Sequence, residues 1–174
     1  MLPLITNGDV QGLKTYYNEH IAPINEQLEK ELGDYSQIDH IQLPLIRARV
    51  VELINTVSLM PNVDLYIGID NIIDNVPIKE MDLFTILNIY LDNAIEEVAS
   101  HEKAIAAVYM TITPDKFTLM VENSLKGKES TTKPLHTNKG LEIVRDIIIT
   151  YPDIVVHTHI EMNWFKQKLV VISE

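Results

Sequence analysis

An amide, Asn93, and two carboxylates, Glu96 and Glu97, lie on one edge of the helix predicted for LDNAIEEV, residues 91–98. Asn93 offers an amide oxygen, a hard ligand that suits Mg²⁺, which takes few protein ligands and completes its shell with phosphate and water. Glu96 and Glu97 offer carboxylates that can act as a base or order a metal-bound water. A helix-border asparagine and a solvated acidic pair are the ordinary alternatives, so this segment alone does not define a site.

The segment TTKPLHTNKGL, residues 131–141, is a polar loop that leads into a predicted helix. Free backbone N–H groups and the helix dipole at a helix start favour phosphate, and nearby hydroxyl and ammonium groups add to this preference. An ordinary loop capped by Asn138 is the alternative, and the P-loop pattern GxxxxGK[ST] does not occur. The candidate phosphate-binding residues are Thr131, Thr132, Lys133, Thr137, Asn138, Lys139 and Gly140.

Other polar residues give weaker signals. Asn123 ends the segment FTLMVEN, where its amide can read the edge of an adenine or simply begin a turn. The six histidines show no HExxH or other tight metal-ligand spacing, and we interpret His157 and His159, which alternate on one predicted strand, as structural. No serine nucleophile elbow occurs.

Hydrophobic periodicity predicts the elements that hold these residues. The segment 79–100 has apolar residues at the 3.6-residue period of a helix, with Asn93 at the border of the apolar stripe. Pro114-Asp115 and Met162-Asn163 are the predicted turns of two hairpins. Predicted helices span 9–32, 44–59, 79–100 and 139–150, and predicted strands span 63–69, 104–112, 117–123, 154–161 and 165–172.

Hairpins dominate this order, and helices are inserted singly between strands. The order predicts an α/β (α+β) two-layer sandwich, in which a mixed, mainly antiparallel sheet is covered on one face by helices. We expect two regions, a helical segment over residues 1–60 and the main domain over residues 61–174.

Composition narrows the function further. The chain has 174 residues, 46% of them hydrophobic, which is enough for a sizeable core. It has no cysteine, which fits a reducing cytoplasm and excludes disulfides. The net charge of −11 argues against nucleic acid and against an anionic membrane surface. We expect a soluble cytoplasmic chain, attached to a membrane only through segments outside this sequence.

Together these segments resemble the ATP-binding domain of the GHKL superfamily, the Bergerat fold. More narrowly, they resemble the peptide-pheromone receptor histidine kinases of Gram-positive bacteria, the AgrC/ComD type. LDNAIEE matches that family's N-box, VENS its adenine-reading position, TTKPLHTNKGL its lid and NWFKQKLVV its closing strand. The resemblance implies that Asn93 chelates Mg²⁺ and that Asn123 reads adenine. It also implies that the lid, which includes Lys133, Gly140 and Leu141, closes over the phosphates of ATP.

The sequence departs from that family at several positions. Thr137 stands where the lid arginine is expected, Asn138 where the first lid glycine is expected, and Ile89 where many kinases have a further asparagine. A DxGxG box is absent, and so is the HDY-like motif of the phosphoacceptor histidine. DVQGLKTYYNEHIAP resembles the stretch that follows the acceptor helix, so we expect the acceptor to lie outside this sequence.

The function implied by the resemblance is that of a quorum-sensing sensor histidine kinase. Its ATP-binding portion would transfer the γ-phosphoryl group of Mg-ATP to a histidine outside this chain, for relay to a response regulator. The N-terminal helices would form a homodimer in the full protein. Two alternatives are a serine kinase of the anti-sigma-factor type and a degenerate interaction module that binds no nucleotide. The helical residues 9–59 argue against the first, and the lid departures favour the second.

Overall fold

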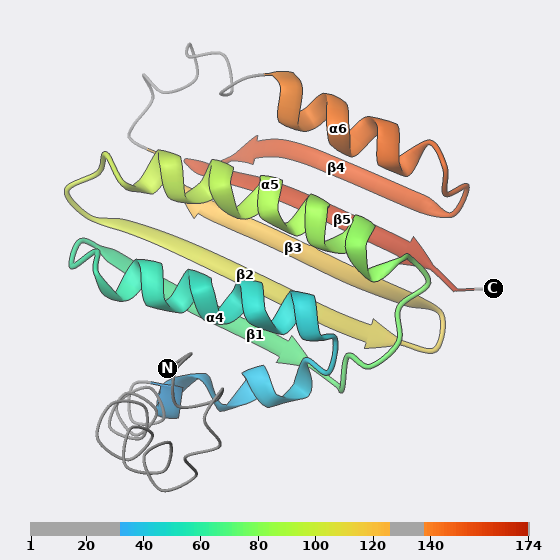
Figure 1. Cartoon of the computed structure of the whole chain (residues 1–174). Helices are drawn as coiled ribbons and strands as arrows, with labels where there is room; N and C mark the ends of the chain where they lie inside the picture. The colour runs from blue at the N-terminus through green and yellow to red at the C-terminus, as the bar shows by residue number, and fades with distance from the viewer. Residues whose placement is uncertain (1–31, 126–137, 174) are drawn as a thin grey trace, which may run out of the picture. The chain divides into compact units, whose positions relative to one another are not determined.

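A five-stranded sheet forms the framework that carries the candidate site (Figure 1). The computed structural model describes residues 32–125 and 138–173. The chain divides into two units, Met1–Ser36 and Gln37–Glu174, and the sheet belongs to the second. Residues 9–31 of the first predicted helix lie outside the described residues. The described elements are η2 (Leu32–His40), α4 (Pro44–Ser58), β1 (Val63–Asp70), α5 (Glu80–Val98), β2 (Ala104–Thr113), β3 (Lys116–Ser124), α6 (Asn138–Ile148), β4 (Ile154–Glu161) and β5 (Trp164–Ile172).

The strands follow the order β1-β2-β3-β5-β4 across the sheet. β1 runs parallel to β2, and every other neighbouring pair is antiparallel. The turn between β4 and β5 places Met162 and Asn163 at φ values of 49° and 67°, the left-handed conformation that suits a two-residue hairpin between twisted strands. Both predicted hairpins, with their turns, are confirmed.

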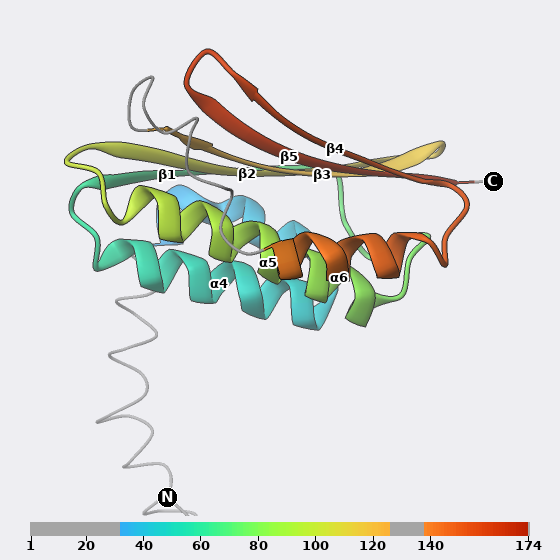
Figure 2. The same ribbon diagram turned by 90° about the horizontal axis from the view of Figure 1, so that it is seen from above.

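The helices α4, α5 and α6 lie on the same face of the sheet, and the other face carries none of the described elements (Figure 2). Alternate residues of the central strands point toward the helices and are buried. These inward residues include Phe117, Leu119 and Val121 of β3 and Phe165, Leu169 and Val171 of β5. The two-layer sandwich predicted from the sequence is therefore confirmed.

The helix α4 packs with α5 and the sheet. Its buried residues include Ile46, Val50 and Leu53, and it contacts α5 and β1. The boundary between the two compact units follows Ser36, so α4 belongs to the same unit as the sheet. The connection after β1 also contributes to the core, because Ile73 is fully buried and forms a β-bridge with Ile41.

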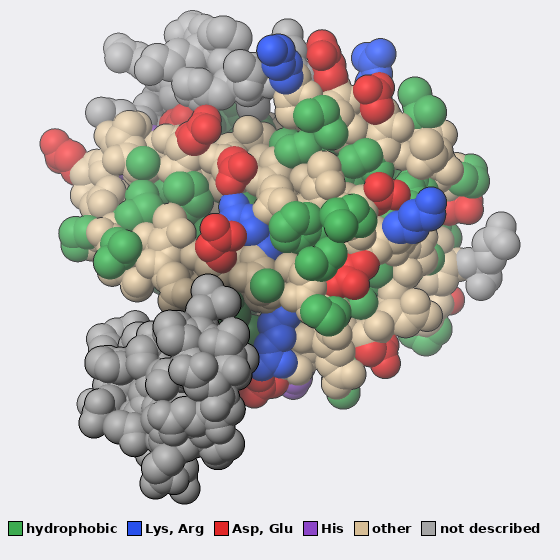
Figure 3. Space-filling view, in the orientation of Figure 1, with side chains coloured by type: hydrophobic (Ala, Val, Ile, Leu, Met, Phe, Trp, Pro, Cys, Tyr) green, Lys and Arg blue, Asp and Glu red, His purple; other side chains and the backbone are tan. Residues whose placement is uncertain are grey.

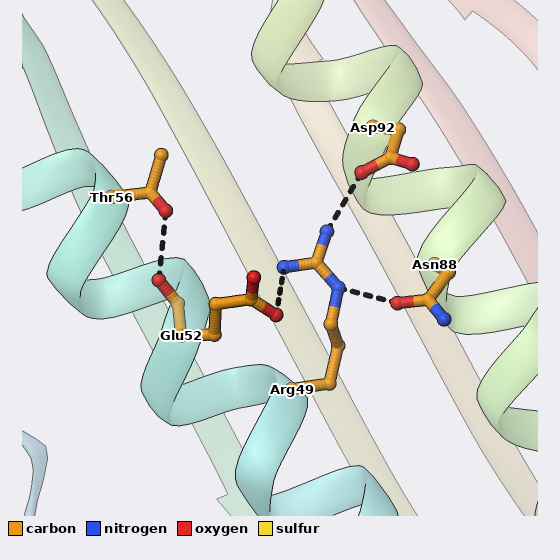
Figure 4. A network of polar contacts seen from close by, with 5 residues as sticks. All are labelled: Arg49, Glu52, Thr56, Asn88 and Asp92. Atoms are coloured by element: carbon orange, nitrogen blue, oxygen red, sulfur yellow. Dashed lines mark hydrogen bonds and ion pairs between the residues drawn. The ribbon is translucent and has the colours of Figure 1, made fainter.

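A polar network joins α4 to α5 across their outer surface (Figure 4). Arg49 donates from Nε to Oδ1 of Asn88 at 2.5 Å and from Nη2 to Oδ1 of Asp92 at 2.7 Å. Its Nη1 lies 3.3 Å from Oε2 of Glu52 on its own helix. Only 11% of the Arg49 side chain is exposed. This planar fork fixes the position of α5 along α4, since its two partners lie one helical turn apart.

The helix-bearing face of the described chain is a mixed surface. Acidic side chains are scattered among apolar ones, and lysine and arginine side chains lie apart from one another (Figure 3). Met81, Ile143 and Ile149 are among its exposed hydrophobic residues. Among the described residues, no helix is both long and apolar enough to cross a membrane.

Candidate functional site

The helix α5 holds Asn93 at the border between core and surface. Its apolar stripe is buried against the sheet and sets the rotation of the helix; the buried residues are Leu83, Ile86, Leu87, Tyr90, Leu91, Ala94 and Val98. Asn93 is half-buried beside this stripe, and its Nδ2 donates to Oε1 of Gln167 on β5 at 3.4 Å. Because the amide nitrogen faces β5, the amide oxygen remains available as a ligand or acceptor.

Asn123 lies near the end of β3, on the side of the sheet that faces the helices. Its side chain is 1% exposed, and its Nδ2 donates to the carbonyl oxygen of Ser124 at 3.1 Å. Its Oδ1 is buried and has no hydrogen-bond partner in the part of the chain that the structure describes. A buried acceptor without a donor is costly, on the order of 1–3 kcal/mol, so this atom is suited to receive a hydrogen bond from a ligand.

Gln167 is a third amide, and none of the motifs identified in the sequence includes it as a site residue. It is 1% exposed, and its Nε2 has no hydrogen-bond partner among residues 32–125 and 138–173. Its polar side chain occupies an inward position between Phe165 and Leu169, where the strand pattern calls for an apolar residue. That mismatch is the signal that could have identified it. Asn93, Asn123 and Gln167 are called the amide cluster below.

Tyr90 adds a hydroxyl to the same inward face of α5, one turn before Asn93. It is fully buried, and no described residue hydrogen-bonds its hydroxyl group. Burial raises the pKa of Tyr90 well above its usual value, so the phenol stays neutral. The helical period by itself places Tyr90 within the apolar stripe of α5 and gives no sign that its hydroxyl lacks a partner.

The two candidate carboxylates have different surroundings. Oε1 of Glu97 lies 3.1 Å from Nε2 of the buried His101, whose carbonyl oxygen accepts a hydrogen bond from Nδ2 of Asn62 at 2.6 Å. This chain of contacts anchors the end of α5 to the segments before β1 and β2. Glu96 is exposed and forms no hydrogen bond or ion pair with the described residues. Of the pair, Glu96 is therefore the one free to act on a ligand.

The lid is only partly described. Thr131, Thr132, Lys133 and Thr137 lie outside the described residues, and α6 begins at Asn138. Lys139 is exposed, and Leu141 is half-buried. A Cβ placed on Gly140 would lie 3.1 Å from Cγ2 of Ile89, so the glycine lets the first turn of α6 approach α5 closely, one turn before Asn93.

The described residues offer no protein-only metal centre. No group of three or more His, Cys, Asp or Glu side chains among them could hold a metal ion. The oxygen of Asn93 fits a metal that takes one protein ligand and completes its shell with phosphate and water, as Mg²⁺ does beside a nucleotide. The donor set therefore fits Mg²⁺ bound together with phosphate.

Comparison with known families decides the classification. Residues 78–172, which include Asn93, Asn123 and Gln167, match the GHKL domain family. The chain belongs to this family. No curated protein sequence matched the chain.

Solved structures share the fold of this GHKL domain. The nucleotide-free catalytic domain of histidine kinase ThkA has 24% identity and a TM-score of 0.59, covering 74% of this chain and 90% of that chain. ThkA in complex with the response regulator protein TrrA has 21% identity and a TM-score of 0.58, covering 98% and 57%. The histidine kinase AdeS of Acinetobacter baumannii has 15% identity and a TM-score of 0.52, covering 98% and 90%. At these identities the similarity establishes the fold alone.

Proposed function

We propose that this GHKL domain binds Mg-ATP and forms the catalytic portion of a two-component sensor histidine kinase. The observation that carries the proposal is the amide cluster, in which Oδ1 of Asn123 and Nε2 of Gln167 are buried without partners among the described residues. A nucleotide base offers donors and acceptors that satisfy both atoms. The family membership and the fold shared with histidine kinase catalytic domains support the same function.

Each site residue has a distinct role in this proposal. Asn93 holds Mg²⁺ through its amide oxygen, and Asn123 accepts a hydrogen bond from adenine. Glu96 supports the attacking group. The residues from Thr131 to Leu141, including Thr132, Lys133, Thr137, Asn138, Lys139 and Gly140, contact the phosphates, helped by the free N–H groups in the first turn of α6.

The reaction moves the γ-phosphoryl group from an oxygen of ATP to a nitrogen of the acceptor histidine. A ring nitrogen of the acceptor histidine attacks the γ-phosphorus of ATP, a P–N bond forms, and the bond to the bridging oxygen of ADP breaks. Mg²⁺, when bound, neutralises charge on the phosphate oxygens. The domain's own residues contribute mainly by positioning the nucleotide and excluding water.

The proposal extends to the subtype and the partners. The N-box, lid and closing strand resemble those of peptide-pheromone receptor kinases, so we assign the domain to a quorum-sensing receptor. The full protein then dimerises through N-terminal helices and passes the phosphoryl group to a response regulator. ThkA, which shares the fold, has been observed in complex with the response regulator TrrA, which supports this class of partner.

Phosphoryl transfer in trans tests the proposed function. This chain is incubated with γ-labelled ATP, alone and with a helical fragment that carries a kinase acceptor histidine. We expect an acid-labile, base-stable phosphate on the fragment and none on this chain, with slow transfer because donor and acceptor are not held on one scaffold. Label on His20 or His40 would show that the acceptor is misplaced, and acid-stable label on a serine would favour the serine-kinase alternative.

A further inference from the structure

The amide cluster leaves one acceptor and one donor unused on the same side of the sheet. These atoms are Oδ1 of Asn123 and Nε2 of Gln167, both buried and without partners in the described part of the chain. The strand register pairs Asn123 with Phe165 and Val121 with Gln167, so the two amides are diagonal neighbours on β3 and β5. In a diagonal pair, side chains as long as those of asparagine and glutamine lie close enough to contact the same ligand.

Neighbouring groups determine which atom of each amide remains free. Nδ2 of Asn123 donates to the carbonyl oxygen of Ser124 at 3.1 Å, which leaves Oδ1 as the acceptor. Oε1 of Gln167 accepts from Nδ2 of Asn93 at 3.4 Å, which leaves Nε2 as the donor. Reversing Asn123 or Gln167 alone would break its existing hydrogen bond. Reversing Gln167 together with Asn93 would keep a bond between them but would turn Oδ1 of Asn93 toward Gln167. With Asn93 as the metal ligand, the two residues therefore present an acceptor beside a donor.

This order is complementary to one purine and not to the other. The Watson–Crick edge of adenine presents the N6 amino donor beside the N1 acceptor, whereas guanine presents the O6 acceptor beside the N1–H donor. We propose that Gln167 is a specificity-determining residue: its Nε2 donates to N1 of adenine while Oδ1 of Asn123 accepts from N6. Guanine would set acceptor against acceptor and donor against donor. This inference rests on the proposed function, because it requires a bound nucleotide.

The contact between Gln167 and Asn93 gives the glutamine a second consequence. The same carboxamide that faces the base also holds the amide nitrogen of Asn93, the proposed Mg²⁺ ligand. Gln167, which contacts the base, and Asn93, which holds the metal, are therefore joined by one hydrogen bond between β5 and α5. Arrangements of this kind fix ligand orientation, as outer-shell partners do at metal sites generally.

The test compares the dissociation constants of ATP and GTP, measured by calorimetry, for the parent chain and two variants. Gln167→Met keeps the length of the side chain but removes both the donor and the acceptor that contacts Asn93. Both nucleotides lose the effect of the Asn93 contact, but ATP should lose about tenfold more affinity than GTP, so the preference collapses. Gln167→Glu replaces the donor by an acceptor that matches N1–H of guanine and still accepts from Asn93. The ratio of GTP affinity to ATP affinity should therefore be higher in Gln167→Glu than in Gln167→Met.

A matched control separates specificity from stability. Thr118→Val alters a buried polar residue of β3 on the opposite face of the sheet, and it should leave the ratio of ATP to GTP affinity unchanged. A parent-like ratio in both Gln167 variants, or equal losses for the two nucleotides, overturns the specificity role while leaving ATP binding intact. A parent chain that binds neither nucleotide overturns the proposed function and this inference with it. Gln167→Glu, which keeps the contact with Asn93, decides the question if Gln167→Met fails to fold.

Discussion

Three polar side chains on successive turns of α5 have different surroundings although their sequence contexts are similar. The hydroxyl of Tyr90 is buried without a partner among the described residues, Asn93 contacts β5, and Glu97 pairs with His101. The position of each relative to the buried stripe decides which neighbour it meets. Tyr90 faces the sheet, Asn93 lies at its border, and Glu97 points toward the end of the helix, where it stabilises the fold.

Removing the hydroxyl of Tyr90 should stabilise the chain in the absence of nucleotide. Tyr90→Phe deletes a buried group that no described residue hydrogen-bonds, which should raise the free energy of unfolding by about 1 kcal/mol. Urea unfolding at neutral pH measures this difference. A less stable variant would show that the hydroxyl group already has a partner.

The same substitution should change the alkaline pH dependence of stability. Burial raises the pKa of Tyr90 in the folded state above that of an exposed tyrosine, which is about 10. The folded state therefore keeps the phenolic proton at a pH where the unfolded state releases it. Ionisation of this group leaves the free energy of unfolding unchanged below about pH 10 and lowers it at higher pH. Tyr90→Phe should lose less stability than the parent between neutral and alkaline pH.

Glu96 and Glu97 should respond differently to the same truncation. Glu97→Ala should lower the free energy of unfolding by about 1 kcal/mol, because it removes the partner of the buried His101. Glu96→Ala should change stability by less than about 0.5 kcal/mol but slow phosphoryl transfer in trans. Chemical unfolding and the transfer assay, run on both variants, distinguish the two roles. The reverse assignment of effects would contradict the geometry.

The residues of the candidate site were only partly predictable. Asn93 and Asn123 were selected because their segments resemble an N-box and an adenine-reading position. The roles of Gln167 and Tyr90 are not predictable in this way. The period of a strand or helix predicts which face a residue occupies, but not whether its polar atoms find hydrogen-bond partners. The free donor of Gln167 and the free hydroxyl of Tyr90 are properties of packing between α5 and β5.

At the scale of elements, α5 depends on α4 for its position. The guanidinium of Arg49 contacts two residues of α5, Asn88 and Asp92, and Asp92 immediately precedes Asn93. Most of the sheet-facing surface of α5 is apolar, which sets the rotation of the helix but constrains its position along the helix axis only weakly. The fork of Arg49 supplies directional contacts that the apolar stripe lacks.

Arg49→Met should therefore destabilise the chain while keeping the apolar stem. We expect a loss of about 1–3 kcal/mol in the free energy of unfolding, mostly from the partly buried contact with Asn88, since Asp92 is exposed. Arg49→Lys should recover only part of this loss, because an ammonium group cannot bond both partners in the geometry of the fork. A double-mutant cycle with Asn88→Ala measures the coupling, and additive effects would show that the contact contributes nothing.

The elements themselves followed closely from the sequence. Periodicity predicted α4, α5 and both hairpins with ends within a few residues of those observed, because one face of each element is buried and the other is not. The helix η2 and the buried Ile73 were missed. They lie in short, irregular segments where no repeat can develop, and only tertiary contacts such as the bridge from Ile73 to Ile41 order them.

At the scale of the molecule, the family match and the structural unit do not coincide. The match covers residues 78–172, whereas the structural unit begins at Gln37 and adds α4 and β1 to the sheet and the helix layer. Residues 37–77 are therefore part of the same structural unit and supply Arg49, which supports the helix that carries Asn93. A fragment that began at residue 78 would lose these contacts.

The most direct test of the account is a calorimetric titration with ATP, in the presence of Mg²⁺ and in EDTA, on the parent chain and two asparagine variants. The parent should bind ATP more tightly with Mg²⁺. Asn93→Ala should lose that increment and keep the metal-independent part, whereas Asn55→Ala, an exposed asparagine of α4, should behave like the parent. Equal affinities of Asn93→Ala and the parent in Mg²⁺ would contradict the metal role of Asn93. Absence of ATP binding by the folded parent would contradict the central claim and favour an interaction module that binds no nucleotide.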